Sequence, residues 1–272
     1  MVLSPGRTEH IEKYVEVVHE LVGRGFSVVV HDWRGQGLSD RLYTDRLRGH
    51  AVGFDDFIAD FKVLIDVFED RLPRPRIALG HSMGGCLTLL ALARGESRFD
   101  GAILSAPMLG VKTGGQPYAV ARSIAWLMTR IGRGTDYILG GATDPFSGTL
   151  ETDALTHDPI RHDRTYAQLM ANRDLALGNV TWGWLDSALS AMEGLRRAGA
   201  LAKVRIPVTI VAGGQDRLVD NQASVVAAAG LAKGRYVEVP EAMHEIMMET
   251  DELRAPFWRE FDALAAAISP PA

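Results

Sequence analysis

The chain has 272 residues, a formal net charge of −5 and a single cysteine. This length allows one large domain with an insertion, the negative charge argues against an obligate nucleic-acid-binding protein, and a single cysteine excludes an internal disulfide. No apolar run approaches the roughly 18 residues of a membrane-spanning helix, and residues 1–6 do not resemble a signal peptide.

Strand-like and helix-like patterns alternate through the first hundred residues. In chain order they predict strand 2–4, helix 9–22, strand 26–31, helix 54–68, strand 76–79, helix 86–93 and strand 102–105. The run at 26–31 is rich in valine without polar alternation, which is typical of a parallel strand covered on both faces. The chain is therefore predicted to be an α/β protein with a mostly parallel sheet and helices on both faces.

From 108 to 202 this alternation lapses, and helical stretches are separated by loops that contain Gly, Asp and Pro. It resumes with strand 208–211, a helix near 221–231, strand 235–239 and a final helix after Glu252. We therefore predict one domain formed by 1–107 and 203–272, interrupted by a helical insertion at 108–202.

The segment Gly80-His81-Ser82-Met83-Gly84 joins a predicted strand to a predicted helix. Strand, Gly-x-Ser-x-Gly and helix form the nucleophile elbow of the α/β-hydrolase fold, in which a tight turn exposes the serine Oγ above the sheet. Both glycines are needed because a Cβ at either position would collide with the neighbouring strand or helix. Ser82 is thus the predicted nucleophile, the interrupted domain is the catalytic domain, and the insertion is its lid.

A serine nucleophile needs a base, and the base needs an acid that orients it. In this fold the acid and then the histidine follow the serine along the chain. Among the eight histidines, only His244 follows the last two strands. The acid is expected in the loop after strand 208–211, where Asp216 is preferred because Asp220 is placed to cap the next helix.

The oxyanion that forms during ester cleavage needs two N–H donors. Met83, directly after the nucleophile, is predicted to supply one, and Arg7, in the loop after the first strand, to supply the other. No metal or cofactor is expected. His157 and His162 each precede an aspartate, but Pro159 lies between them, so they are not expected to share a helical face as metal ligands.

Several further segments carry a family resemblance over nearly the whole chain. They are Pro5-Gly6-Arg7-Thr8-Glu9 with Lys13-Tyr14, residues 32–39, Gly49-His50, His81-Ser82-Met83-Gly84-Gly85, Ala106-Pro107-Met108, Thr181-Trp182-Gly183-Trp184 and His244-Glu245-Ile246. With these segments the chain resembles the lysophospholipase/monoacylglycerol lipase group of serine hydrolases, most closely the bacterial inner-membrane lysophospholipase branch. The resemblance implies Ser82, Asp216 and His244 as the triad and Met83 and Arg7 as the oxyanion donors.

The same resemblance implies that the protein cleaves carboxylic esters of monoacylated lipids through an acyl-enzyme. The expected location is the cytoplasm or the periphery of the inner membrane, and lipid esters are the expected partners.

Two departures from the family pattern concern the N-terminus. Monoacylglycerol lipases begin the oxyanion loop with His-Gly where this chain has Pro5-Gly6, which favours the lysophospholipase branch, and Gly6 is expected to let the backbone approach the substrate.

The second departure is that the family fold starts with two further strands, and none precedes Val2. We therefore expect about 40 N-terminal residues to be missing and Val28, Val29 and Val30 to form an exposed sheet edge. Pairing of two such edges in a dimer is the alternative.

Two apolar stretches of the insertion, at 123–131 and 182–189, would suit an acyl-chain groove, although such stripes usually pack on a core. The candidate substrate contacts are Trp182, Trp184 and Met108. Three arginines of the insertion could bind a phosphate headgroup, but we favour the interpretation that their side chains are solvated surface charges. They are Arg122, Arg130 and Arg133.

Other activities on this fold stay open, because fold does not settle chemistry. A broad carboxylesterase would use the same triad. An aminopeptidase would need an insertion carboxylate to bind the substrate amine, for which the candidates are Glu151, Asp153 and Asp163. A non-catalytic ligand-binding relative is disfavoured by the intact triad.

Overall fold

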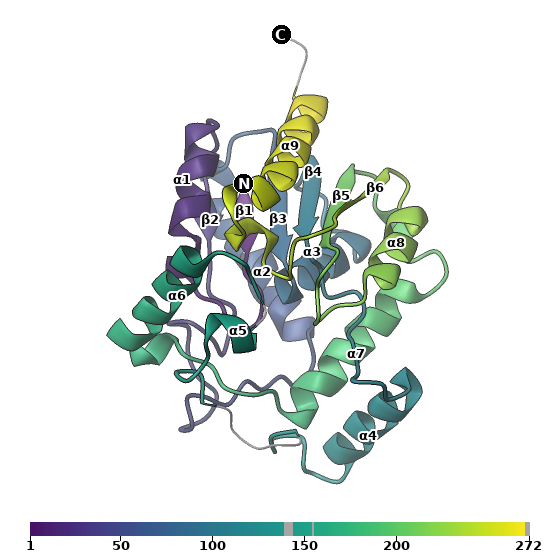
Figure 1. Cartoon of the computed structure of the whole chain (residues 1–272). Coiled ribbons are helices and arrows are strands. Elements are labelled where there is room, and N and C mark those ends of the chain that lie inside the picture. Colours follow the sequence, from purple (N-terminus) through teal and green to yellow (C-terminus); the bar gives the residue numbers. More distant parts are fainter. Residues whose placement is uncertain (139–143, 154, 270–272) are drawn as a thin grey trace.

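The structure, a computed structural model, describes residues 1–138, 144–153 and 155–269 (Figure 1). Six strands form one parallel sheet in the order β2-β1-β3-β4-β5-β6, which confirms the predicted parallel sheet. The strands are β1 (Val2–Ser4), β2 (Val29–Val30), β3 (Ile77–His81), β4 (Gly101–Ser105), β5 (Val208–Gly213) and β6 (Gly234–Val239).

Helices cover both faces of this sheet, with α1 and α9 in front of it and α2 and α3 behind it in Figure 1. The helices are α1 (Val15–Gly23), α2 (Asp55–Phe68), α3 (Met83–Ala93), α4 (Tyr118–Arg130), α5 (Leu150–Asp153), α6 (Pro159–Ala171), α7 (Trp182–Arg196), α8 (Asn221–Gly230) and α9 (Asp251–Ile268). Short 3-10 turns are η1 (Ile11–Tyr14), η2 (Glu69–Arg71), η3 (Arg173–Leu175), η4 (Leu201–Lys203) and η5 (Ile246–Met248). Within the described ranges, no helix is both long enough and apolar enough to cross a bilayer.

Since all six strands are parallel, their carboxyl ends meet at one edge of the sheet, where ligands bind in open α/β sheets. β3 lies between β1 and β4, with Gly80 opposite Ser4 and His81 opposite Ser105. The loops after β1, β3, β5 and β6 therefore open at the same edge. The segment 108–202, predicted to be an insertion, contains α4 to α7, which lie below this edge in Figure 1.

Two predicted elements are shorter than expected. Strand 26–31 is reduced to β2, because the ladder with β1 pairs only Val2 with Val29 and Leu3 with Val30. β2 is an edge strand, as expected, but residues 28–30 are half-buried and pack against the core, so the edge is less exposed than expected. Helix 9–22 begins later, as the turn η1 followed by α1.

Candidate active site

Ser82 sits in a sharp turn between β3 and α3. Its backbone has φ 50° and ψ −115°, which is a strained conformation for a residue with a Cβ. A Cβ on Gly80 would overlap the backbone of Gly85. A Cβ on Gly84 would overlap the carbonyl of Ser4 in β1. The two glycines thus allow the close approach that the Gly-x-Ser-x-Gly spacing predicted.

Three loops bring Ser82, His244 and Asp216 together. His244 Nε2 lies 3.0 Å from Ser82 Oγ, and His244 Nδ1 lies 2.6 Å from Asp216 Oδ2. His244 and Asp216 are almost fully buried. Because the carboxylate accepts the Nδ1 proton, Nε2 is left as an acceptor that can take the proton of the serine hydroxyl. The structure therefore brings together the three residues that the chain order predicted.

Asp216, and not Asp220, faces the histidine. Its second oxygen, Oδ1, accepts hydrogen bonds from the N–H groups of Leu218 (2.7 Å) and Val219 (3.0 Å). Burial by itself raises the pKa of Asp216, but the hydrogen bond and charge of His244 and the two backbone donors outweigh it, so this pKa lies below its ordinary value. Asp220 caps the N-terminus of α8, as predicted.

The predicted oxyanion donors are the backbone N–H groups of Met83 and Arg7. Met83 is the first residue of α3, so its N–H has no carbonyl one turn earlier to bond. Arg7 follows β1, which pairs directly with β3, and within the described residues its N–H donates to no acceptor. Both groups therefore lie at the edge of the sheet that carries Ser82.

Side chains from the loop after β2 hold the backbone of the predicted oxyanion loop. Trp33 Nε1 donates to the carbonyl of Pro5, and Gln36 Nε2 donates to the carbonyl of Gly6, each at 2.8 Å. The N–H of Gly6 donates to the Glu9 carboxylate. A Cβ on Gly6 would overlap that carboxylate, so the structure gives this glycine a packing role that the sequence did not reveal.

A buried cluster of charged side chains, absent from the sequence predictions, lies beneath this loop. Glu9 accepts hydrogen bonds from the Tyr14 hydroxyl (2.5 Å) and from Lys13 Nζ (2.9 Å). His81 Nδ1 lies 3.0 Å from the same carboxylate, and Lys13 Nζ also lies 2.5 Å from Glu245 Oε1. Burial acts to raise the pKa of Glu9, but His81 and Lys13 outweigh it and hold this pKa well below its usual value.

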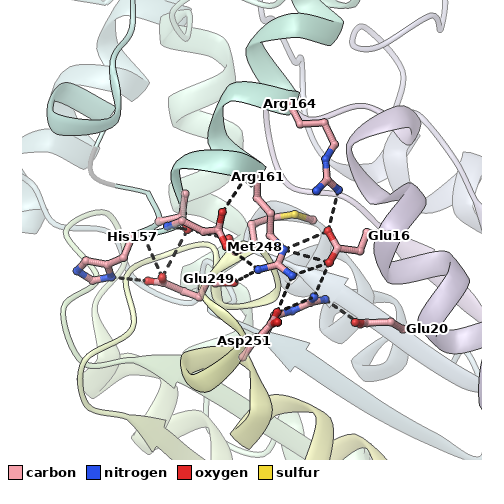
Figure 2. Close-up of polar contacts among 11 residues, drawn as sticks. Glu16, Glu20, His157, Arg161, Arg164, Met248, Glu249 and Asp251 are labelled. Carbon is pink, nitrogen blue, oxygen red and sulfur yellow. Dashed lines mark hydrogen bonds and ion pairs between the residues drawn. The ribbon is translucent and has the colours of Figure 1, made fainter.

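Glu249 holds the loop that carries His244 against the insertion (Figure 2). Its carboxylate is fully buried, and Oε1 accepts the N–H of Met243 (2.8 Å) and lies 2.9 Å from His157 Nδ1. Oε2 accepts the N–H of His157 at 2.9 Å. His157, weighed above as a metal ligand, thus joins the insertion to the loop of the candidate base.

Ion pairs fasten α6 to α1 and α9, as Figure 2 shows. Arg161 Nη2 lies 2.6 Å from Glu16 Oε1 and 2.7 Å from Asp251 Oδ1. Arg164 and Arg254 also pair with Glu16, at 2.7 and 2.9 Å. The hydrogen bonds from Arg161 lower the pKa of Glu16 to about 2, against the opposing effect of burial. Ion pairs therefore hold the α6 side of the insertion against α1 and α9.

Two pockets have walls formed partly by residues 108–202. An apolar pocket of about 470 Å³ lies between α4 and α7 and is lined by residues that include Val120, Ile124, Trp182, Leu185 and Leu189. A mixed pocket of about 660 Å³, with both polar and apolar walls, lies beside the predicted oxyanion loop and is lined by residues that include Arg7, Lys13, Leu169, Leu177 and Glu245. The two pockets thus differ in character and share no lining residue.

The three predicted substrate contacts lie in different surroundings. Trp182 lines the apolar pocket. Trp184 is buried, with its ring 6.1 Å from that of Phe54 and 5.2 Å from the Arg7 guanidinium. Met108 is buried, and its N–H donates to the carbonyl of Ser82 at 2.9 Å. Contact of Trp182, Trp184 and Met108 with a substrate therefore stays a prediction.

The three arginines considered as phosphate ligands contact acidic side chains or an aromatic ring instead. Arg122 pairs with Asp186, and Arg133 pairs with Asp136 at 2.6 Å. Arg130 is exposed and lies over the ring of Trp126. These contacts agree with the favoured interpretation of surface charges.

The insertion carboxylates weighed as amine ligands are exposed where they are described. Glu151 accepts a hydrogen bond from the Thr149 hydroxyl, and Asp163 lies 3.1 Å from His162 Nδ1. The side chain of Asp153 lies outside the described residues. No group of three or more His, Cys, Asp or Glu side chains within the described part of the chain is placed to hold a metal ion.

Comparisons with known proteins agree with this geometry. The family model "Serine aminopeptidase, S33" matches residues 1–251. Lysophospholipase L2 of Escherichia coli (strain K12) is 30% identical over 267 residues, which cover 94% of this chain and 76% of that protein. The monoacylglycerol lipase of Mycolicibacterium smegmatis is 27% identical over 256 residues, which cover 93% and 83%. The crystal structure of Paleococcus ferrophilus monoacylglycerol lipase covers 98% of this chain and 94% of its own, with a TM-score of 0.74 at 22% identity, and confirms the predicted fold.

Proposed function

The chain belongs to the serine aminopeptidase S33 family of α/β-hydrolases, and we propose that within this family it cleaves carboxylic esters of monoacylated lipids, as a lysophospholipase or monoacylglycerol lipase. In this proposal Ser82 is the nucleophile, His244 is the general base and Asp216 orients the base. The observation that carries the proposal is the alignment of the three side chains, at 3.0 Å and 2.6 Å.

In the proposed reaction, His244 Nε2 takes the proton of Ser82 while Oγ attacks the ester carbonyl carbon. The N–H groups of Met83 and Arg7 donate to the oxyanion, and loss of one such donor costs about 3 kcal/mol of transition-state stabilisation. The tetrahedral intermediate expels the alcohol, which receives the proton from His244. Water then hydrolyses the acyl-enzyme by the same steps. Protein groups carry every step, so we propose no metal or cofactor.

Two pockets support monoacylated lipids as the proposed substrates, an apolar one between α4 and α7 and a mixed one beside the predicted oxyanion loop. The apolar pocket between α4 and α7 would hold the acyl chain, with Trp182 in its wall. We propose that residues 108–202 act as the lid of a catalytic domain formed by 1–107 and 203–272. The names of the relatives, a lysophospholipase and a monoacylglycerol lipase, support this substrate class. A location in the cytoplasm or at the periphery of the inner membrane belongs to the same proposal.

A substrate comparison tests the function. We expect kcat/KM on long-chain monoacyl lipids to exceed that on p-nitrophenyl acetate, and Ser82→Ala to abolish both activities. Faster cleavage of amino-acid anilides than of any lipid ester would favour the aminopeptidase alternative. A wild-type protein that neither cleaves these esters nor reacts with a fluorophosphonate would favour the non-catalytic alternative.

A further inference from the structure

Arg7 carries a guanidinium that has no carboxylate partner within the described residues. Its Nη2 donates to the carbonyl of Gly178 at 2.6 Å, and its Nε is buried without a hydrogen-bond partner in the described structure. The guanidinium carbon lies 5.2 Å from the centre of the Trp184 ring. Gly49 makes room for the group, because a Cβ there would overlap Nη2. The fold therefore accommodates this cation without neutralising it.

Burying such a group lowers the free energy of unfolding, because a charge removed from water needs an opposite charge or a full set of hydrogen bonds. Burial lowers the pKa of Arg7 to about 9, so the cation is destabilised but still charged at neutral pH. Arg161, by contrast, faces Glu16 and Asp251. A ligand with two anionic oxygens would suit Arg7, since a guanidinium binds phosphate or carboxylate through two parallel hydrogen bonds.

The mixed pocket that Arg7 lines provides space for such a ligand. Two acidic residues of its lining, Glu9 and Glu245, share Lys13, and Glu9 also faces His81, whose pKa the Glu9 carboxylate helps to raise against burial. The third, Asp144, is exposed to solvent. Among the described residues of this lining, the buried charge that faces no opposite charge is therefore the guanidinium of Arg7.

We propose that the Arg7 guanidinium binds the phosphate of a lysophospholipid headgroup, so that the mixed pocket receives the headgroup while the apolar pocket receives the acyl chain. The inference rests on the proposed function, because it assigns a substrate to the same active site. In a lysophospholipid, only the glycerol carbons separate the phosphate from the scissile ester. Arg7 would hold the ester oxygen with its N–H and the phosphate with its side chain, which favours lysophospholipids over monoacylglycerols.

The test compares lysophosphatidylethanolamine with a monoacylglycerol of the same acyl chain. Arg7→Met removes the charge but keeps an unbranched side chain, and Arg7→Lys keeps the charge without the planar fork. We expect the ratio of the two kcat/KM values, lysophospholipid over monoacylglycerol, to fall on the order of tenfold or more in Arg7→Met and less in Arg7→Lys, mainly through KM. Arg133→Met, which removes an exposed arginine paired with Asp136, is the control and should leave the ratio unchanged.

An equal loss on both substrates would overturn the inference, because the side chain would then only hold the oxyanion loop in place. A second measurement avoids lipid turnover. Glycerol 3-phosphate should slow fluorophosphonate labelling of the wild type at concentrations where glycerol does not, and Arg7→Met should lose this protection. Protection by glycerol 3-phosphate that persists in Arg7→Met would also overturn the inference. An equal loss of kcat/KM on both substrates would leave the proposed function intact. A wild-type protein that is labelled but cleaves no lipid ester would refute both the proposed function and the role of Arg7.

Discussion

Lys13 Nζ lies 2.5 Å from Glu245 Oε1, and this buried ion pair joins the turn after the oxyanion loop to the residue that follows His244. Lys13 also pairs with Glu9, whose carboxylate accepts the N–H of Gly6. A buried ion that loses its partner is strongly destabilising. The position of the proposed oxyanion donor Arg7 and the position of the proposed base His244 therefore depend on one cluster.

Replacing Glu9 with glutamine should lower kcat more than it raises KM. The amide is neutral and cannot accept from all the donors that converge on this carboxylate, so the oxyanion loop should shift. We expect a loss of kcat on the order of tenfold to a hundredfold, measured on a p-nitrophenyl ester. Glu241→Gln, an exposed residue three positions before His244, is the control. Full kcat in Glu9→Gln, or the same loss in the control, would refute this role.

Asp216→Asn should lower kcat by about 10⁴-fold, because the amide would favour the wrong tautomer of His244. Asp220→Asn should leave kcat within about twofold, since asparagine also caps helices. Both variants should fold, which circular dichroism can verify. Equal losses, or a larger loss in Asp220→Asn, would mean that the acid is wrongly assigned.

Acid should loosen the ion pairs that anchor α6. The pKa of Glu16 is about 2 in the folded protein, against an ordinary value of 4.5, chiefly because Arg161 hydrogen-bonds to it. Its stabilising contribution is therefore complete above about pH 4.5 and is lost as the pH falls towards 2. Glu16→Gln should lower the Tm at pH 7 and lower it much less at pH 2.5.

The control for this pH experiment is Glu252→Gln in α9, where the glutamate is exposed. Its Tm should follow that of the wild type at both pH values. A Glu16→Gln deficit that is as large at pH 2.5 as at pH 7 would show that the effect does not come from the charge.

Trp182 and Trp184 should differ in what they control. Trp182→Ala enlarges the apolar pocket and should change the ratio of kcat/KM between long and short acyl esters. Trp184→Ala removes a buried ring and should cost about 3–5 kcal/mol of unfolding free energy. Assays on a C4 and a C16 ester, with urea unfolding, separate the two effects. An unchanged ratio in Trp182→Ala would mean that this side chain only packs.

The meeting of Ser82, Asp216 and His244 could be predicted from the sequence because each occupies a loop that the parallel strand order places at one edge of the sheet. The cluster beneath the oxyanion loop could not. Glu9 and Lys13 are four residues apart, a spacing that also suits a surface ion pair on a helix, and only the tertiary structure buries them. The two tryptophans of α7 show a similar limit. Side chains two positions apart on a helix do not face each other, but the sequence does not say which one meets the pocket.

Covalent labelling tests the central claim, that Ser82 is the nucleophile, most directly. After reaction with a fluorophosphonate, intact-mass spectrometry of the wild type should show one adduct, and peptide mapping should place it on Ser82. Ser82→Ala should take up no label while keeping the Tm of the wild type within a few degrees. Labelling of Ser82→Ala at the wild-type rate, or an adduct mapped to another residue, would contradict the account.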